Sequence, residues 1–274
     1  MTKPYLVIEA GKTEQRYWQD IWNYRELLYF LAWRDILVRY KQTVIGIAWA
    51  VIRPVLTMIV FSIIFGKIAN LPSGEAPYPI MVFAALLPWT FFATALNDAG
   101  NSLITNSNLI SKVYFPRLLI PVSAIGVCLV DLLLSLIILC LLMFAYQHSP
   151  PWQVIFLPFF IFLAISVSLG LSIFLAALNV TYRDFRHIIP FIIQLGLFLS
   201  PVGFTSSIIP EQWKYLYALN PMVGVIDGFR WAILGGDHKI DPINISISIG
   251  ITAILLIFGI KYFRMTEKKF ADVI

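Results

Sequence analysis

Two charged residues stand inside otherwise apolar stretches, and their chemistry needs the most explanation. Arg53 lies within the stretch 44–65, and Asp131 lies within 118–146. An ionised side chain at the centre of a bilayer costs about 2.5–3.5 kcal/mol on insertion scales, so such residues pair with one another or line a wet path. We expect Arg53 and Asp131 either to neutralise each other or each to face a polar route.

The residue patterns of enzymes are absent from the sequence. Gly11-Lys12-Thr13 imitates the end of a phosphate-binding loop, but Leu6 stands where that motif requires its first glycine. His148, His187 and His238 fall in three separate loops, without the spacing of a metal site. We therefore expect no catalytic residue, no metal ion and no cofactor on this chain, so another subunit must power any energetic work.

The composition predicts an all-α integral membrane protein. Of the 274 residues, 59% are apolar and 13% are charged, whereas soluble domains carry about 25% charged residues. A membrane-spanning helix needs about 20 apolar residues. Six stretches are predicted to span: 44–65, 80–97, 118–146, 154–178, 188–204 and 243–262. The net charge of +5 is explained by membrane topology, and no nucleic-acid partner is indicated.

Two further segments are predicted to lie on the membrane or dip into it. Residues 1–43 are expected to contain an amphipathic interface helix with a break or rotation near Ala32. Residues 205–236 hold two apolar pieces separated by Asn220-Pro221, and each piece is too short to cross. We predict a re-entrant helical hairpin on the outer side, between the fifth and sixth spans. The alternative is a seventh span, which would place the C-terminus outside.

The basic residues orient these segments. With the N-terminus inside, 15 Lys and Arg fall in the inner segments and four in the outer ones. The positive-inside rule therefore favours six spans with both termini in the cytoplasm. The chain then divides into a cytoplasmic segment 1–43, a transmembrane domain 44–262 with inner loops 98–117 and 179–187, and a cytoplasmic tail 263–274.

Several short motifs follow one another along nearly the whole chain. They are Arg39-Tyr40-Lys41-Gln42-Thr43, Gly46, Trp49 and Arg53-Pro54; a loop, 108–117, that ends Lys-Val-Tyr-Phe-Pro-Arg; Tyr182-Arg183-Asp184; Ser200-Pro201-Val202; and Asn220-Pro221. In this order they resemble the membrane subunit of type-2 ABC exporters. The branch that they resemble moves O-antigen, capsular and teichoic-acid polysaccharides.

The resemblance implies a homodimer in the bacterial inner membrane, with two copies of a separate ABC ATPase subunit that binds ATP and Mg. The substrate would be a polysaccharide on a polyprenyl-diphosphate lipid. The segment before the first span would form the inner entrance, and 205–236 would form the outer gate. The inner loops would dock on the ATPase, and the docking residues would be Leu109, Lys112, Tyr114, Phe115, Arg117, Tyr182, Arg183 and Asp184.

Two further sets of residues are our own inference. Cationic side chains suit a diphosphate, so the expected entrance residues are Arg34, Arg39, Lys41 and Arg53. Aromatic faces suit sugar rings, so the expected channel lining is Trp89, Phe91, Phe92, Phe198, Phe204 and Tyr215. Aromatic residues also anchor membrane proteins at the interfaces, which is the other explanation for them. The path would open between the first and fifth spans of facing subunits.

Three other functions stay open. An ABC exporter of drugs or simple lipids would keep the same architecture. A proton-coupled secondary transporter would use Asp131, stop on addition of an uncoupler and ignore ATP. A membrane-embedded glycosyl- or acyltransferase would need an acidic or histidine cluster at one membrane face, and the sequence offers none.

Overall fold

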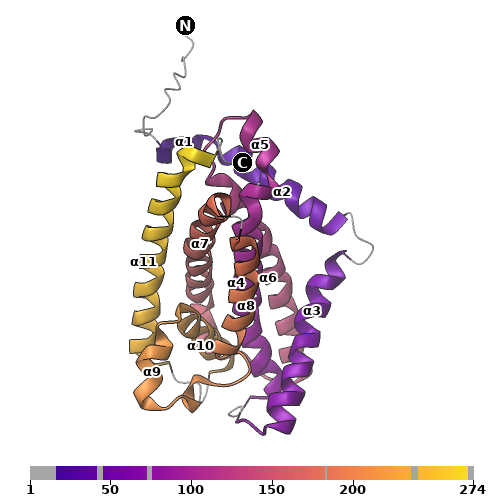
Figure 1. Ribbon diagram of the computed structural model, residues 1–274. Helices are drawn as coiled ribbons and strands as arrows, with labels where there is room; N and C mark the ends of the chain where they lie inside the picture. Colours follow the sequence, from indigo (N-terminus) through magenta and orange to yellow (C-terminus); the bar gives the residue numbers. More distant parts are fainter. Residues whose placement is uncertain (1–16, 42–45, 73–75, 183, 236–239, 271–274) are drawn as a thin grey trace.

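The computed structural model describes residues 17–41, 46–72, 76–182, 184–235 and 240–270, and in these ranges it contains helices and no strands. The helices are α1 (Tyr17–Asn23), α2 (Arg25–Lys41), α3 (Gly46–Phe61) continued by a π-helix (Ser62–Ile68), α4 (Tyr78–Thr105), α5 (Ser107–Lys112), α6 (Leu119–Ala145), α7 (Leu157–Thr181), α8 (Phe185–Leu199), α9 (Glu211–Ala218), α10 (Pro221–Leu234) and α11 (Pro242–Thr266). The long helices run side by side, as Figure 1 shows.

Five of the six predicted spans are confirmed as helices long and apolar enough to cross a membrane. They are Val51–Ile68, Tyr78–Thr105, Leu119–Ala145, Trp152–Thr181 and Pro242–Thr266. The exception is α8, whose 15 residues rise only about 22 Å at 1.5 Å per residue. The predicted range 188–204 extended too far, because the chain leaves the helix at Ser200-Pro201. The count of six spans stays a prediction.

The most buried helix is α4, which occupies the centre of the bundle. It packs against α3, α6, α7, α8 and α10. Its residues 80–87 are at most 1% exposed. α11 packs against the far side of α7, and α3 stands at the edge of the bundle (Figure 1).

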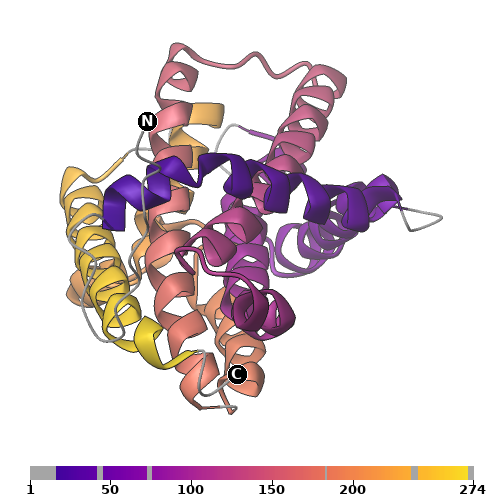
Figure 2. The ribbon, with the colours of Figure 1, turned by 90° about the horizontal axis from the view of Figure 1, so that it is seen from above.

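α1 and α2 lie across one end of the bundle, which we call the α2 end; the opposite end is the α9 end (Figures 1 and 2). α2 crosses α6 closely, since a Cβ on Gly126 would lie 3.9 Å from that of Ala32. The predicted break near Ala32 is absent, and the helix is interrupted instead at Tyr24. α2 continues as one helix past Ala32, with Leu31 buried against the bundle and Trp33 exposed.

Local sequence explains where the last two helices begin. Asn220 accepts a hydrogen bond from the N–H of Met222 at 3.0 Å, and Asp241 accepts one from Ile243 at 2.9 Å. Each of these caps is followed by proline at the first helical position, where its missing N–H costs nothing. α10 ends at Gly235, whose φ of 59° is a conformation that glycine adopts without strain. The two short helices predicted within 205–236 are confirmed, and their depth in a membrane stays a prediction.

α7 and α11 approach each other so closely that only glycine fits at the crossing. A Cβ on Gly259 would lie 2.3 Å from the backbone oxygen of Gly170. Gly259→Ala is therefore expected to lower the free energy of unfolding by about 1–3 kcal/mol, the usual cost of overpacking. Gly250 lies on the same helix with nothing within 4 Å of its Cβ position. Gly250→Ala should be neutral or stabilising by up to about 1 kcal/mol. Thermal unfolding in detergent compares the two variants, and equal midpoints would contradict the tight crossing.

Candidate functional site

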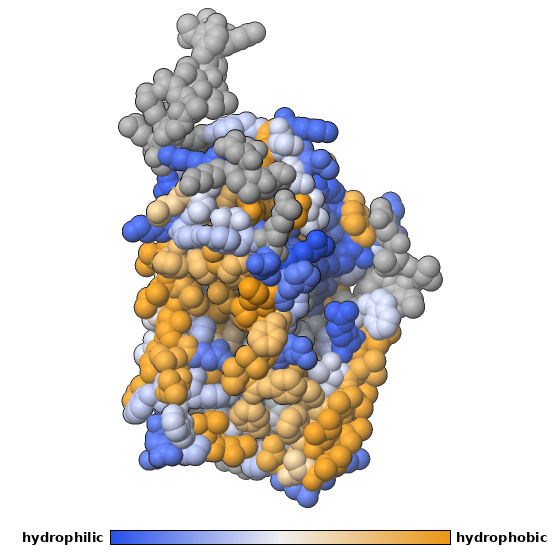
Figure 3. Space-filling model, in the orientation of Figure 1, coloured by the Kyte–Doolittle hydropathy of each residue, from blue (hydrophilic) through white to orange (hydrophobic). Residues whose placement is uncertain are grey.

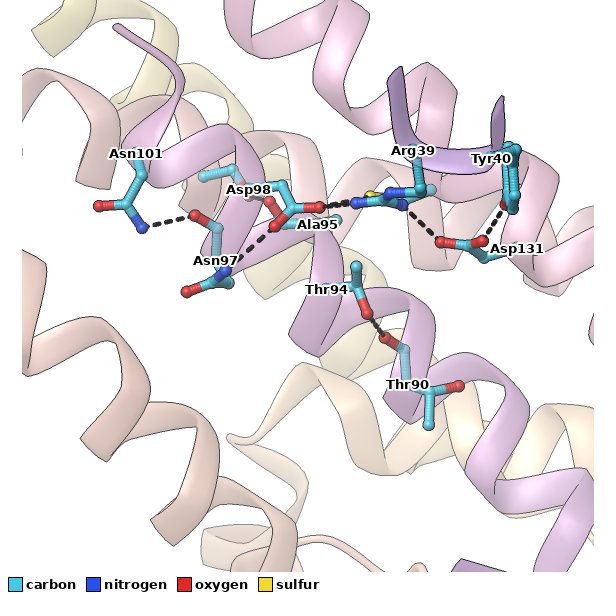
Figure 4. A network of polar contacts seen from close by, with 11 residues as sticks. Arg39, Tyr40, Thr90, Thr94, Ala95, Asn97, Asp98, Asn101 and Asp131 are labelled. Atoms are coloured by element: carbon cyan, nitrogen blue, oxygen red, sulfur yellow. Dashed lines mark hydrogen bonds and ion pairs between the residues drawn. The ribbon is translucent and has the colours of Figure 1, made fainter. Parts of the chain in front are cut away.

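A cluster of ionised side chains at the α2 end joins three helices (Figure 4). Arg39 of α2 donates one hydrogen bond to Asp131 of α6 at 2.6 Å and another to Asp98 of α4. The hydroxyl of Tyr40 donates to the second carboxylate oxygen of Asp131. We call these four residues the α2 anchor. Burial alone would lower the pKa of Arg39, but Asp98 and Asp131 raise it above its ordinary value, so the guanidinium stays charged.

The anchor shows how the negative charge of Asp131, inside the third predicted span, is neutralised. Asp131 pairs with Arg39 and Tyr40, and not with Arg53 as one of our expectations had it. Arg53 is exposed on α3 and forms no ion pair with any residue whose position is described. The reason is geometric: α2 crosses α6 and brings its last turn beside Asp131, a contact that the sequence order does not reveal.

A shallow hollow lies along one face of α2, beside the anchor. It is lined by Phe30, Trp33, Arg34, Leu37, Val38 and Lys41. Arg34 also donates to Asn106 at 2.9 Å and pairs with Asp35. Of the four cations expected at an entrance, the structure therefore brings Arg34 and Lys41 together, directs Arg39 to the anchor and leaves Arg53 on another helix. We call this surface the α2 hollow.

The aromatic residues expected to line a channel fall into two groups. Trp89, Phe91 and Phe92 of α4 are 4%, 3% and 6% exposed and belong to the hydrophobic core of the chain. Trp89 packs so tightly that a Cβ on Gly196 of α8 would lie 2.8 Å from its ring. The second group is accessible: Phe198 and Tyr215 are exposed, and Phe204 is partly exposed. The α4 aromatics therefore act in helix packing.

One buried residue with several partners escaped the sequence analysis. Arg230 of α10 is 1% exposed and donates to the backbone oxygens of Phe204 at 2.7 Å and Val202 at 2.9 Å. Asp227, one helical turn earlier, accepts a hydrogen bond from Ser206 at 2.6 Å. These bonds tie α10 to the segment that follows α8. The signal was present, since Asp227 and Arg230 are the only charged residues of an otherwise apolar helix.

Comparison with known proteins places the chain in a family. Residues 26–234 match the family described as ABC-2 type transporter. The chain belongs to this family. It is 28% identical over 261 residues to the O-antigen export system permease protein RfbA of Myxococcus xanthus, covering 93% of this chain and 98% of that protein. It is also 26% identical over 250 residues to an RfbA of Klebsiella pneumoniae, with 91% and 95% covered.

A third relative of this ABC-2 transporter is named for a different polysaccharide. The polysialic acid transport protein KpsM of Escherichia coli is 22% identical over 237 residues, covering 86% of this chain and 91% of KpsM. The family and the similar permeases confirm the resemblance drawn from the short motifs. The chain is thus a multi-pass membrane permease of the ABC-2 type.

Two motifs that carried the resemblance meet in the structure of this ABC-2 transporter. The side chain of Asn220 donates to the hydroxyl of Ser200 at 2.9 Å. Ser200-Pro201-Val202 and Asn220-Pro221 thereby form one junction at the α9 end, next to the carbonyls that Arg230 holds. The two motifs are distant in the sequence, but together they join the segment that follows α8 to the start of α10.

The residues expected to dock on an ATPase lie at the α2 end, but they are not equally accessible. Lys112, Tyr114, Tyr182 and Asp184 are exposed, and Leu109 is partly buried. Phe115 is buried, and Arg117 donates through its backbone N–H to Glu267 at 2.8 Å and through its side chain to the Glu267 carbonyl. These two hold the loop against the end of α11. Arg183 lies outside the described residues.

Proposed function

We propose that this chain is the channel-forming subunit of an ATP-driven exporter that carries polyprenyl-diphosphate-linked polysaccharide across the bacterial inner membrane. Membership of the ABC-2 family and the similarity to O-antigen permeases support this function. Two copies of the chain form the path, and two copies of a separate ATPase subunit bind ATP and Mg. Both termini lie in the cytoplasm, as the distribution of basic residues favours.

The α2 hollow is the observation that supports a polyprenyl-diphosphate-linked polysaccharide as the substrate. It combines two cations, Arg34 and Lys41, with the apolar surface of Phe30, Trp33 and Leu37. A polyprenyl-diphosphate carrier has the same two parts, an anionic diphosphate and a long apolar chain. Guanidinium and ammonium groups bind phosphate oxygens through charge-assisted hydrogen bonds. The lipid tail would stay against the aromatic side while the diphosphate meets the cations.

The exposed residues of the inner loops provide the surface for the ATPase. Lys112 ends α5 and Tyr114 follows it, while Tyr182 and Asp184 flank the turn between α7 and α8. Because Arg117 fixes the first loop to α11, force applied there reaches a membrane helix directly. Movement of the ATPase would be transmitted through these contacts to the path between facing subunits.

A lipid-stimulated ATPase assay tests the substrate assignment. The complete complex in proteoliposomes should hydrolyse ATP faster when polyprenyl-diphosphate-linked glycan is added. Arg34→Gln and Lys41→Gln should each raise the half-maximal glycan concentration about tenfold, equivalent to about 1.4 kcal/mol. Arg25→Gln is the matched control, because Arg25 lies on the same helix outside the α2 hollow, over the ring of Trp22.

Two outcomes would contradict the assignment. If simple lipids or drugs stimulate the wild-type complex and lipid-linked glycan does not, the cargo is wrong. If glycan stimulates but both Gln variants match the control, the diphosphate binds elsewhere. Proton-coupled transport through Asp131 is not proposed, since that carboxylate is engaged by Arg39 and Tyr40 and the chain belongs to an ABC family.

A further inference from the structure

α4 has one polar face although it is the most buried helix. Thr90, Thr94, Asn97 and Asn101 are spaced four, three and four residues apart, which places them on one side of a helix. Figure 4 shows them following one another along α4 up to the α2 anchor. The buried aromatics Trp89, Phe91 and Phe92 lie off this side. We call the four residues the α4 polar face.

This face is open although its helix is central. Asn97 is exposed, and Thr90, Thr94 and Asn101 are partly exposed. α4 packs against α3 on one side and against α8 on the other, while α3 and α8 have no more than marginal contact with each other. Figure 3 shows hydrophilic surface inside a hollow between the apolar surfaces of α8 and α3. The α4 polar face therefore lies at the bottom of an open furrow.

The furrow lies between helices with apolar surfaces. The two helices beside it carry exposed apolar residues, among them Leu56 and Ile59 of α3 and Phe191 and Leu195 of α8. Amide and hydroxyl groups turned towards lipid would lose their hydrogen bonds to water, which is costly at this depth. The face is therefore suited to water or to a polar ligand, and not to acyl chains.

The hydrogen bonds of Thr90, Thr94 and Asn97 leave acceptors free on the α4 polar face, whereas the side-chain oxygen of Asn101 accepts from Asn179 at 3.0 Å. The hydroxyls of Thr90 and Thr94 donate to carbonyls of their own helix, at 2.7 Å and 2.8 Å. The amide of Asn97 donates to Asp98 at 3.0 Å, and no described residue donates to its side-chain oxygen. A hydroxyl that donates still has lone pairs to accept with. The face thus presents neutral acceptors, which complement ligands rich in O–H groups.

The furrow is closed towards the α9 end. Its α2 end meets the anchor at Asp98. Towards the α9 end the ring of Phe65 packs where a Cβ on Gly203 would lie, only 2.7 Å away, and Tyr78 donates to the Gly203 carbonyl at 2.5 Å. From Thr90 to Asn101 the helix rises about 16 Å at 1.5 Å per residue. A ligand would enter from the α2 end.

We propose that the α4 polar face is the wall against which the sugar units of the exported glycan move. The inference rests on the proposed function and names the surface that contacts the cargo. Uncharged acceptors hold any hydroxyl-bearing sugar weakly, so different rings can pass. This wall differs in chemistry from the aromatic lining that the sequence suggested.

Thiol labelling in proteoliposomes tests the inference directly. The parent is Cys140→Ser, whose remaining Cys128 is buried and sets the background. Asn97→Cys in this parent should react with a charged, membrane-impermeant thiol reagent applied from the α2 side. Excess lipid-linked glycan should slow that reaction at least fivefold. Phe162→Cys is the control on the exposed apolar surface of α7, and it should stay unlabelled.

Function is measured alongside the labelling. Asn97→Leu combined with Thr94→Val should lower the glycan export rate at least fivefold, while Ser246→Ala, an exposed helix-bonded hydroxyl on α11, should leave it unchanged. If the wild-type complex exports no glycan, the proposed function fails. If it exports glycan but Asn97→Cys is unlabelled or unprotected, only the present inference fails. Export by the double variant at the wild-type rate would also overturn it.

Discussion

Replacing Arg230 with methionine is expected to loosen the α9 end and to lower the free energy of unfolding by about 3–5 kcal/mol, the usual cost of removing one member of a buried charged group. Arg230 is 1% exposed and donates to the carbonyls of Val202 and Phe204. Methionine has a similar length but no donor, so both carbonyls would stay buried without these partners and Asp227 would lose its nearby cation. The melting temperature of the purified protein in detergent measures the effect.

The Arg230 prediction can be separated from a general effect of charge. Arg230→Lys keeps the charge but presents no planar fork to two carbonyls, so it should recover only part of the loss. Lys214→Ala is the matched control at the same end, since Lys214 forms an exposed ion pair with Asp241 at 2.6 Å. Such pairs contribute at most about 1 kcal/mol. A melting temperature of Arg230→Met equal to that of Lys214→Ala would contradict the structural role of Arg230.

Replacing Arg39 with alanine is expected to detach the end of α2 and to reduce export at least tenfold, equivalent to about 1.4 kcal/mol or more in the effective barrier. The change leaves Asp98 and Asp131, both partly buried, without their shared cation. Hydrogen bonds to charged groups contribute about 1.5–3 kcal/mol each, less here because the side chains retain some contact with solvent. The export rate in proteoliposomes with the ATPase present measures the loss.

Arg39 is a positioning residue, so a second measurement follows the position of α2 itself. The Cβ atoms of residues 32 and 126 would lie 3.9 Å apart, within the range of disulfides. Ala32→Cys with Gly126→Cys should therefore cross-link efficiently in the presence of Arg39 and poorly after Arg39→Ala. Restored export once the cross-link has formed would show that Arg39 acts by holding α2.

Two comparisons limit the interpretation of the Arg39 experiment. Tyr40→Phe removes one hydroxyl of the anchor and no charge, so its effect should be smaller than that of Arg39→Ala. Arg25→Ala removes a cation from the other end of α2 and should leave both the cross-link and the export rate unchanged. Unaltered cross-linking in Arg39→Ala would show that α2 is held by apolar packing alone.

Arg39 does not take part in the proposed binding of the diphosphate carrier. Four cations were expected at the entrance, and Arg39 is committed to Asp98 and Asp131. Arg34 and Lys41 line the α2 hollow, where Arg34 also pairs with Asp35 and donates to Asn106. α2 thus places Arg39 in the anchor and Lys41, together with Arg34, on the surface of the α2 hollow.

The amino-acid sequence by itself determined the class of protein, five of the spans and the main breaks. Apolar length, proline and capping residues act locally, so each segment carries its own information. Asn220-Pro221 predicted the separation of α9 from α10, and the structure places it there. The family resemblance was likewise contained in short motifs whose order the sequence preserves.

Only the tertiary structure decided which side chains meet. Arg39 and Asp131 are 92 residues apart, and no pattern in either segment indicates that the two side chains pair. The sequence also did not show which face of α4 points into the bundle, because a helix that is apolar on most sides can bury any of them. Packing against the surrounding helices turned Trp89 inward and left Asn97 in the furrow. Such choices depend on the contacts of the whole bundle, which residue type and spacing along one segment do not specify.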